Sequence, residues 1–123
     1  MSKLTVCIVD DDSAVRESLR MILERADYEV RCFASGRIFL SQGDLSQCGC
    51  LLLDQYMPGL SGTTLLERLK SCGTAGRTIL MTGANAEELR PTARAAGALA
   101  VLQKPMAAGD LLPWIDRAMA APT

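Results

Sequence analysis

Hydrophobic residues form two kinds of pattern along this chain. Short apolar or alternating runs predict strands, and segments with an apolar residue every three or four positions predict helices. The strand-like segments are residues 4–9, 28–33, 51–54, 78–81 and 99–102. All but the second are apolar without alternation, as expected for strands buried on both faces of a sheet.

Helical spacing follows each of these segments. The expected helices carry their apolar positions within residues 15–26, 38–40, 65–69, 86–96 and 111–119. Ser13 is placed to cap the first helix, Asn85 or Ala86 begins the fourth, and Gly97 ends the fourth as a left-handed cap residue. Five strands alternating with five helices predict one α/β domain over residues 1–123, built on a doubly wound parallel sheet.

Two prolines fall inside the last two helical segments. Pro91 and Pro113 have no N–H to donate and clash with the carbonyl four residues earlier, which costs about 3 kcal/mol in a helix interior. Both become tolerable if the helices begin late, near Glu87–Glu88 and near Asp110. We therefore expect the last two helices to be shortened or kinked.

Composition excludes several classes of function. Of 123 residues, 49% are hydrophobic and 22% are charged, with a formal net charge of −1. This balance argues against disorder and gives no overall attraction to nucleic acid or membranes. Aromatic residues make up only 4%, so base stacking is not expected. No apolar run approaches a membrane span and the chain does not start like a signal peptide, so we expect a cytoplasmic protein.

Five cysteines and no histidine limit the metal and acid–base chemistry. Cys48 and Cys50 are close enough in sequence to suggest a metal pair. No second close pair accompanies them, and zinc normally needs four nitrogen or sulfur ligands. We expect free thiols in a reducing compartment rather than a zinc site.

Chemically active residues stand where the expected strands end. Asp10 and Asp11 follow the first strand, Asp54 closes the third, Thr82 follows the fourth and Lys104 the fifth. Because parallel strands end at the same edge, these groups should converge. Three neighbouring carboxylates suit a hard cation such as Mg²⁺, and the Lys and Thr complete a cradle for a phosphoryl group. Singly, each also fits a turn, a helix start or a surface lysine.

These strand ends, with the turn Met57-Pro58-Gly59 and the pairs Thr82-Gly83 and Lys104-Pro105, resemble the receiver domain of two-component response regulators. The resemblance covers essentially the whole chain. It implies a flavodoxin-like sheet with strand order 2-1-3-4-5. It also implies a phosphorylation-dependent switch rather than an enzyme, apart from self-phosphorylation from phosphodonors and slow autodephosphorylation. The implied partners are a sensor histidine kinase or phosphotransfer protein and an output protein, with no direct binding to nucleic acid or membrane.

Site roles follow from the same resemblance, position by position. Asp54 is the phosphoacceptor, and Thr82 and Lys104 contact the phosphoryl oxygens. The metal, Mg²⁺ or Mn²⁺, has four implied ligands: Asp10 (directly or through water), Asp11, Asp54 and the backbone carbonyl of Tyr56. The Lys104–Pro105 bond is expected to be cis, which aims the lysine inward.

Two departures from the family concern the response to phosphorylation. Val101 stands three residues before the lysine, where receivers commonly carry an inward-turning Phe or Tyr, so we expect a damped surface change between states. The face made by the last two helices and the last strand usually meets output partners or a second receiver, and a homodimer through it is one expectation. Ala84 and Tyr56 flank the implied phosphoryl position. Ala84 has no polar group to orient a water molecule, which favours slow loss of the phosphate.

Three other functions stay open from the sequence. Asp10-Asp11-Asp12 contains the Asp-x-Asp of haloacid-dehalogenase-type phosphatases, with Asp10 as nucleophile, although the chain offers no cap domain and no late acidic metal pair. A receiver-like interaction module that works without phosphorylation is the second. A flavin-binding flavodoxin is the third, although no phosphate-cradling loop follows the first strand. A stand-alone regulator and a receiver within a longer protein are both compatible with the sequence.

Overall fold

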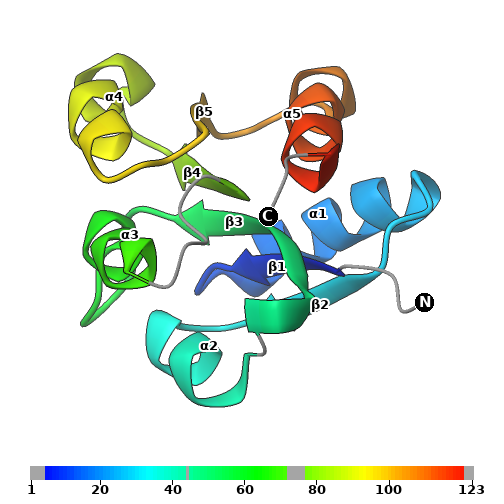
Figure 1. Ribbon diagram of the computed structural model, residues 1–123. Helices are drawn as coiled ribbons and strands as arrows, with labels where there is room; N and C mark the ends of the chain where they lie inside the picture. The colour runs from blue at the N-terminus through cyan, green and yellow to red at the C-terminus, as the bar shows by residue number, and fades with distance from the viewer. Residues whose placement is uncertain (1–4, 44, 72–76, 121–123) are drawn as a thin grey trace.

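A parallel β-sheet forms the centre of the computed structural model, which describes residues 5–43, 45–71 and 77–120 (Figure 1). Its strands are β1 (Thr5–Val9), β2 (Val30–Phe33), β3 (Cys48–Asp54), β4 (Thr78–Thr82) and β5 (Ala100–Gln103). Their order is β2-β1-β3-β4-β5, and every neighbouring pair is parallel. The predicted fold class and strand order are confirmed.

Helices cover both faces of this sheet. Those of the described chain are α1 (Ser13–Arg25), α2 (Gly36–Gln42), α3 (Gly62–Lys70), α4 (Ala86–Ala95) and α5 (Ala108–Ala120). Buried side chains of α2, α3 and α4 form a core on one face, and those of α1 and α5 form a core on the other. Successive residues of β3 point to opposite faces, so Leu53 joins the first core and Leu52 the second. Burial on both faces explains the unbroken apolar run of this strand.

The N-terminus of α1 is capped by Asp12 rather than by the predicted Ser13. The carboxylate of Asp12 accepts hydrogen bonds from the backbone N–H groups of Ala14 at 2.9 Å and Val15 at 3.4 Å. A negative charge also suits the positive end of the helix dipole. The carboxylate of Asp12 therefore caps α1.

Pro91 and Pro113 lie inside α4 and α5. The helices begin at Ala86 and Ala108, so the predicted late starts near Glu87–Glu88 and near Asp110 are wrong. Each proline removes one N–H from the helical hydrogen-bond ladder. Tertiary packing compensates for this loss, because a buried face holds each helix against the sheet. Gly97, with φ at 94°, follows α4 in the left-handed conformation that was predicted.

A bulge at the start of β3 separates the two cysteines that suggested a metal pair. Thr5 of β1 pairs with Cys48, but the next residue, Val6, pairs with Cys50. Cys48 therefore lies in one core and Cys50 in the other. A hydrogen bond with Cys7 and burial raise the pKa of the Cys48 thiol, and burial raises the pKa of Cys50 to about 12. The cysteines of the described chain are free thiols, and Cys72 lies outside the described residues.

Gly62, the first residue of α3, lies against the end of β3. A β-carbon here would lie 2.6 Å from the carbonyl oxygen of Asp54 and 2.9 Å from Cδ2 of Leu80. Gly62→Ala should therefore force the β3–α3 connection apart and lower the free energy of unfolding by about 1–3 kcal/mol. Urea unfolding measures this loss.

Gly109, in the first turn of α5, provides a matched control. Nothing lies within 4 Å of a β-carbon added at this position. Gly109→Ala should leave stability unchanged or raise it by up to about 1 kcal/mol. Equal losses in the two variants would contradict the close approach of α3 to Asp54.

Candidate functional site

The predicted site residues come together at one edge of the sheet. Asp10 and Asp11 follow β1, Asp54 ends β3, Thr82 ends β4 and Lys104 follows β5. Because the strands are parallel, all of these positions lie at their carboxyl ends, where open α/β sheets bind ligands. This convergence follows from the topology of the sheet alone, so the order of strands and helices along the sequence was enough to predict it.

Lys104 ties two of the aspartates together. Its Nζ lies 2.6 Å from Oδ2 of Asp10 and 3.0 Å from Oδ1 of Asp54. The backbone N–H of Lys104 donates to the carbonyl of Thr82 at 2.8 Å, which holds the lysine beside the end of β4. The Lys104–Pro105 peptide bond is cis, as predicted. The ammonium group is thus held in direct contact with the Asp54 carboxylate.

Three carboxylates form a compact acidic cluster. One oxygen each of Asp10, Asp11 and Asp54 lies within 4.8 Å of the others. Asp10 is fully buried and Asp54 is 4% exposed, whereas Asp11 is exposed and opens the cluster to solvent. Mg²⁺ prefers oxygen ligands and usually keeps several waters, so it needs few protein groups. This set of donors therefore fits the divalent cation that the sequence predicted.

Asp10 also has partners that the sequence did not single out. Its Oδ1 accepts from the backbone N–H of Asp12 at 2.9 Å, and its carbonyl oxygen accepts from Nη1 of Arg16 at 2.7 Å. Arg16 thus brings a second cationic side chain to the cluster from α1. The only sign of this role in the sequence was the position of Arg16, in the first turn of the helix that follows Asp10 and Asp11.

Burial and neighbouring charges shift the proton affinities of the site. Burial raises the pKa of Asp54 and the neighbouring carboxylates raise it further, against the lowering effect of Lys104. Burial alone would lower the pKa of Lys104, but its hydrogen bonds to Asp10 and Asp54 outweigh this, so its pKa is raised. The amine therefore stays charged at neutral pH, while Asp54 holds a proton more tightly than a free aspartate does.

Metal-free stability should depend on the ionisation of Asp54. Its raised pKa means that the native state binds the proton more tightly than the unfolded state, for which the ordinary value is 3.8. The resulting stabilisation is complete below that value and is lost as pH rises through the raised pKa. Asp54→Asn cannot ionise, so it should gain stability relative to the wild-type protein as pH rises from acidic to neutral. Urea unfolding in EDTA at a series of pH values measures the gain.

Asp12→Asn is the control for this pH dependence. It removes a neighbouring carboxylate that lies outside the cluster, and asparagine still caps a helix well. The pH-dependent gain should therefore be absent from this variant. The same gain in both variants would show that general charge repulsion, rather than the environment of Asp54, is responsible.

Thr82 is buried at the end of β4, 1% exposed. Its hydroxyl oxygen accepts a hydrogen bond from the backbone N–H of Ala84 at 3.0 Å. This bond uses a lone pair and leaves the O–H proton free to be donated to an oxygen placed near Asp54. Ala84 is exposed and offers only its backbone to such a group.

Gln55 fixes the turn that follows Asp54, and the sequence did not single it out. Its Oε1 accepts from the backbone N–H of Thr63 at 2.9 Å, and its Nε2 donates to the Thr63 hydroxyl at 3.2 Å. Its backbone carbonyl accepts from the N–H of Gly62 at 2.9 Å. The next residue is Tyr56, which is 63% exposed and whose backbone carbonyl is the predicted metal ligand. Gln55 therefore ties the backbone of this turn to the first turn of α3.

Known proteins with similar sequences are response regulators. The family model described as the response regulator receiver domain matches residues 6–116. The tetrathionate response regulatory protein TtrR of Salmonella typhimurium is 34% identical over 115 residues, which cover 94% of this chain and 56% of that protein. The transcriptional regulatory protein FixJ of Azorhizobium caulinodans is 40% identical over 102 residues, which cover 83% of this chain and 48% of that protein.

Solved structures show the same architecture. The response regulator StyR has a TM-score of 0.87 and 37% identity, covering 96% of this chain and 60% of that chain. The crystal structure named FixJ-N has a TM-score of 0.85 and 30% identity, covering 100% of this chain and 98% of that chain. This chain spans about half the length of the curated relatives it matches.

Proposed function

Because this chain belongs to the response regulator receiver domain family, we propose that Asp54 accepts a phosphoryl group from a partner histidine kinase or phosphotransfer protein in a Mg²⁺-dependent reaction. Phosphorylation switching in two-component systems is the general function of the family. The observation that carries the assignment to Asp54 is the contact of Lys104 with this carboxylate, within a cluster of three aspartates.

Each side chain has a distinct task in the proposed reaction. A carboxylate oxygen of Asp54 forms the new bond to phosphorus as the bond from phosphorus to the donor atom breaks. Lys104, already beside Asp54, neutralises negative charge on the transferred oxygens, and the Thr82 hydroxyl donates to one of them. Asp10, Asp11, Asp54 and the carbonyl of Tyr56 would hold Mg²⁺ or Mn²⁺, which when bound supplies further positive charge to the phosphoryl oxygens.

An apolar hollow beside Lys104 is suited to the phosphodonor. A cavity of about 230 Å³ lies where the start of α1 meets the segment after β5. Its lining residues are Ala14, Val15, Ser18, Leu19, Lys104, Pro105 and Met106. A partner side chain bound there would bring its phosphoryl group to the edge that carries Asp54.

We extend the proposal to the whole chain. Residues 1–123 form one receiver domain that acts in the cytoplasm and passes its state to other proteins by contact. Its chemistry is limited to self-phosphorylation and slow loss of the phosphate. Separately, every helix in the described part of the chain is too short or too polar to span a bilayer.

The phosphatase alternative requires Asp10 and Asp12 to act together, and their contacts disfavour it. Asp10 is fully buried, and its two carboxylate oxygens are bound to Lys104 and to the N–H of Asp12. The carboxylate of Asp12 caps α1 instead of facing the acidic cluster. Neither residue is placed as a nucleophile or acid for a substrate that enters from solvent.

Intact-mass spectrometry after treatment with acetyl phosphate tests the proposal. With Mg²⁺ we expect one added phosphoryl group that is lost on mild alkaline treatment, as acyl phosphates are. With EDTA we expect little or none, because Lys104 and Arg16 then offset only part of the charge of three carboxylates and an incoming phosphoryl group. Labelling that does not depend on the metal, or no labelling at all, would contradict the proposal and favour a module that works unphosphorylated.

Mg²⁺ should stabilise the folded protein through Asp11. At about a hundred times its dissociation constant, a ligand that binds only the native state adds about 2.7 kcal/mol. Asp11→Asn should reduce this gain to half or less, because one charged ligand of the cluster is lost. Asp12→Asn, its neighbour outside the cluster, should keep the gain. Thermal unfolding with and without Mg²⁺ measures both, and equal gains in the two variants would exclude Asp11 as a ligand.

A further inference from the structure

Gln55 uses all four of its polar groups to join the end of β3 to two other elements. Its backbone N–H donates to the carbonyl of Met81 in β4 at 2.8 Å, and its backbone carbonyl accepts from the N–H of Gly62 in α3. Its side chain binds both the backbone N–H and the hydroxyl of Thr63. Gln55 is only 8% exposed, and a buried amide is costly unless it is hydrogen-bonded. An apolar side chain could be buried here without partners, so the two bonds to Thr63 are what glutamine adds.

These two side-chain hydrogen bonds, the Gln55–Thr63 pair, close the base of the loop formed by residues 56–60. Within the described part of the chain, the backbone groups of this loop form no hydrogen bond with other backbone groups. Met57 and Leu60 anchor the loop only by apolar packing in the core, where they are 9% and 8% exposed. Hydrogen bonds therefore fix the path of this loop at its base.

Tyr56 is the first residue of the loop. No backbone N–H of the described chain donates to its carbonyl oxygen, the proposed metal ligand, so the lone pairs of this oxygen are available to a cation. A carboxylate ligand can adjust by rotation of its side chain, but the direction of a carbonyl is set by the path of the planar peptide backbone. Mg²⁺ requires near-ideal octahedral geometry. A small change in the path of the loop should therefore weaken metal binding.

We propose that Gln55 is a positioning residue for the metal: its bonds to Thr63 fix the direction of the Tyr56 carbonyl and thereby set the affinity of the site for Mg²⁺. The inference rests on the proposed function, to which the metal and the Tyr56 ligand belong. It adds that the affinity is controlled from α3, a helix that supplies none of the proposed ligands. Loss of a group that orients a metal ligand typically lowers metal affinity by about 10- to 100-fold.

Direct binding of Mn²⁺ to the full chain, without any phosphodonor, tests this proposal. Free Mn²⁺ has a characteristic electron paramagnetic resonance spectrum that is lost on binding, so a titration gives the dissociation constant. Gln55→Met keeps the length of the side chain but cannot bind Thr63, and it should raise the dissociation constant about tenfold. Thr63→Val removes only the hydroxyl, so it should have a smaller effect. The double variant should bind Mn²⁺ no more weakly than Gln55→Met, because the hydroxyl acts through Gln55.

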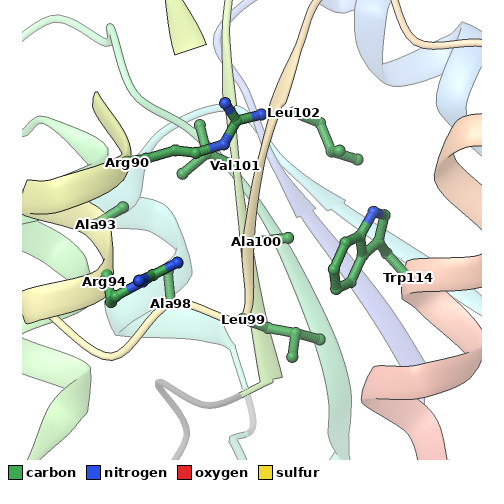
Figure 2. Close-up of a pocket in the computed structure, with 9 residues that line it drawn as sticks. All are labelled: Arg90, Ala93, Arg94, Ala98, Leu99, Ala100, Val101, Leu102 and Trp114. Carbon is green, nitrogen blue, oxygen red and sulfur yellow. The ribbon is translucent and has the colours of Figure 1, made fainter. Parts of the chain in front are cut away.

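Gln103→Met is the matched control, because Gln103 also binds the start of a helix through its side chain. Its Oε1 accepts from the backbone N–H of Ala86 in α4 at 3.3 Å. Gln103 ends β5, two strands away from β3. Figure 2 shows β5 running between Arg90 of α4 and Trp114 of α5. Loss of this bond should change the dissociation constant for Mn²⁺ by less than about twofold.

The Mg²⁺ dependence of labelling separates positioning of the metal from a general loss of structure. In Gln55→Met, the Mg²⁺ concentration that gives half the maximal labelling rate should rise about tenfold. The maximal rate at saturating Mg²⁺ should stay within about twofold of the wild-type rate, because Lys104 and Thr82 keep their places. A lower maximal rate without a shift in the Mg²⁺ dependence would contradict the proposed role of Gln55.

Hydrogen exchange at the Thr63 amide measures the same coupling from the opposite side. If the Gln55–Thr63 pair favours metal binding, bound Mg²⁺ must stabilise the pair by the same factor. Saturating Mg²⁺ should therefore slow exchange of the Thr63 N–H in the wild-type protein by about tenfold, and by much less in Gln55→Met. Nuclear magnetic resonance resolves this single amide. Equal slowing in the two proteins would contradict the coupling.

Two results of the Mn²⁺ titration would overturn the proposal: wild-type affinity in Gln55→Met, or an equal loss of affinity in Gln103→Met. If Gln55→Met does not fold, Thr63→Val decides, and unchanged affinity in that variant overturns the proposal. Binding of Mn²⁺ that depends on Gln55 in a protein that cannot be labelled would contradict phosphoryl transfer alone. Labelling that requires Mg²⁺, with unchanged affinity in Gln55→Met, would contradict the role of Gln55 alone.

Discussion

Asp54→Asn should abolish phosphoryl labelling by acetyl phosphate under conditions that label the wild-type protein fully. An amide is not an anionic nucleophile, and no other carboxylate of the cluster can replace it. Asp10 is fully buried with both oxygens engaged, and Asp11 is a proposed ligand of the metal. Lys104 contacts both Asp10 and Asp54, and because both oxygens of Asp10 already accept hydrogen bonds, Asp54 is the carboxylate left to accept the phosphoryl group. We therefore expect a complete loss rather than a reduction.

Asp12→Asn is the matched control for this result. It removes one carboxylate two residues from Asp10, keeps the helix cap and leaves the acidic cluster intact. Labelling of this variant should match that of the wild-type protein. Undiminished labelling of Asp54→Asn would show that another residue is the acceptor. Equal losses of labelling in both variants would show that removal of a negative charge, rather than removal of Asp54 itself, is responsible.

Lys104→Met should have two large effects. Loss of the ammonium group leaves Asp10 and Asp54 without their shared cation, and breaking a buried ion pair typically costs 3–5 kcal/mol. Because the Lys104 side chain is 19% exposed, we expect about 3 kcal/mol in the free energy of unfolding without metal. The phosphoryl transfer rate should fall by about 10²–10³, as when one preorganised donor to a developing charge is removed.

Mg²⁺ should partly rescue the stability of Lys104→Met, because a bound cation also offsets the charge of the carboxylates. Urea unfolding with EDTA and with Mg²⁺ measures this rescue, and the rate of labelling measures the kinetic effect. Lys70→Met is the control, since Lys70 is exposed and donates to the carbonyl of Ala95 at the end of α4. Similar losses from the two lysine variants would show that Lys104 has no special place in the site.

Much of the fold could be predicted because apolar pattern and topology are strongly linked in a doubly wound sheet. The continuous apolar run at Leu51–Leu53 predicted a strand covered on both faces, and the alternation of strands and helices predicted a parallel sheet. Once the sheet is parallel, Asp10, Asp54 and Lys104 must lie at one edge. The chemistry of that edge then follows from residue types at strand ends.

Other features depend on packing that no local pattern encodes. Pro91 and Pro113 disfavour helix interiors locally, yet burial of the inner faces of α4 and α5 outweighs that preference. The bulge that separates Cys48 from Cys50 arises from pairing with β1, a strand about forty residues away in sequence. Gln55 acts through a hydrogen bond to the next helix. Tertiary contacts decide these positions.

Whether Asp54 is the acceptor is most directly measured by mapping the phosphorylated residue. After treatment with acetyl phosphate and Mg²⁺, borohydride reduces an aspartyl phosphate to homoserine, which peptide mass spectrometry locates in the sequence. We predict conversion at position 54 alone. Conversion at Asp10 or Asp11, or a phosphoryl group found on a serine or threonine, would contradict the account.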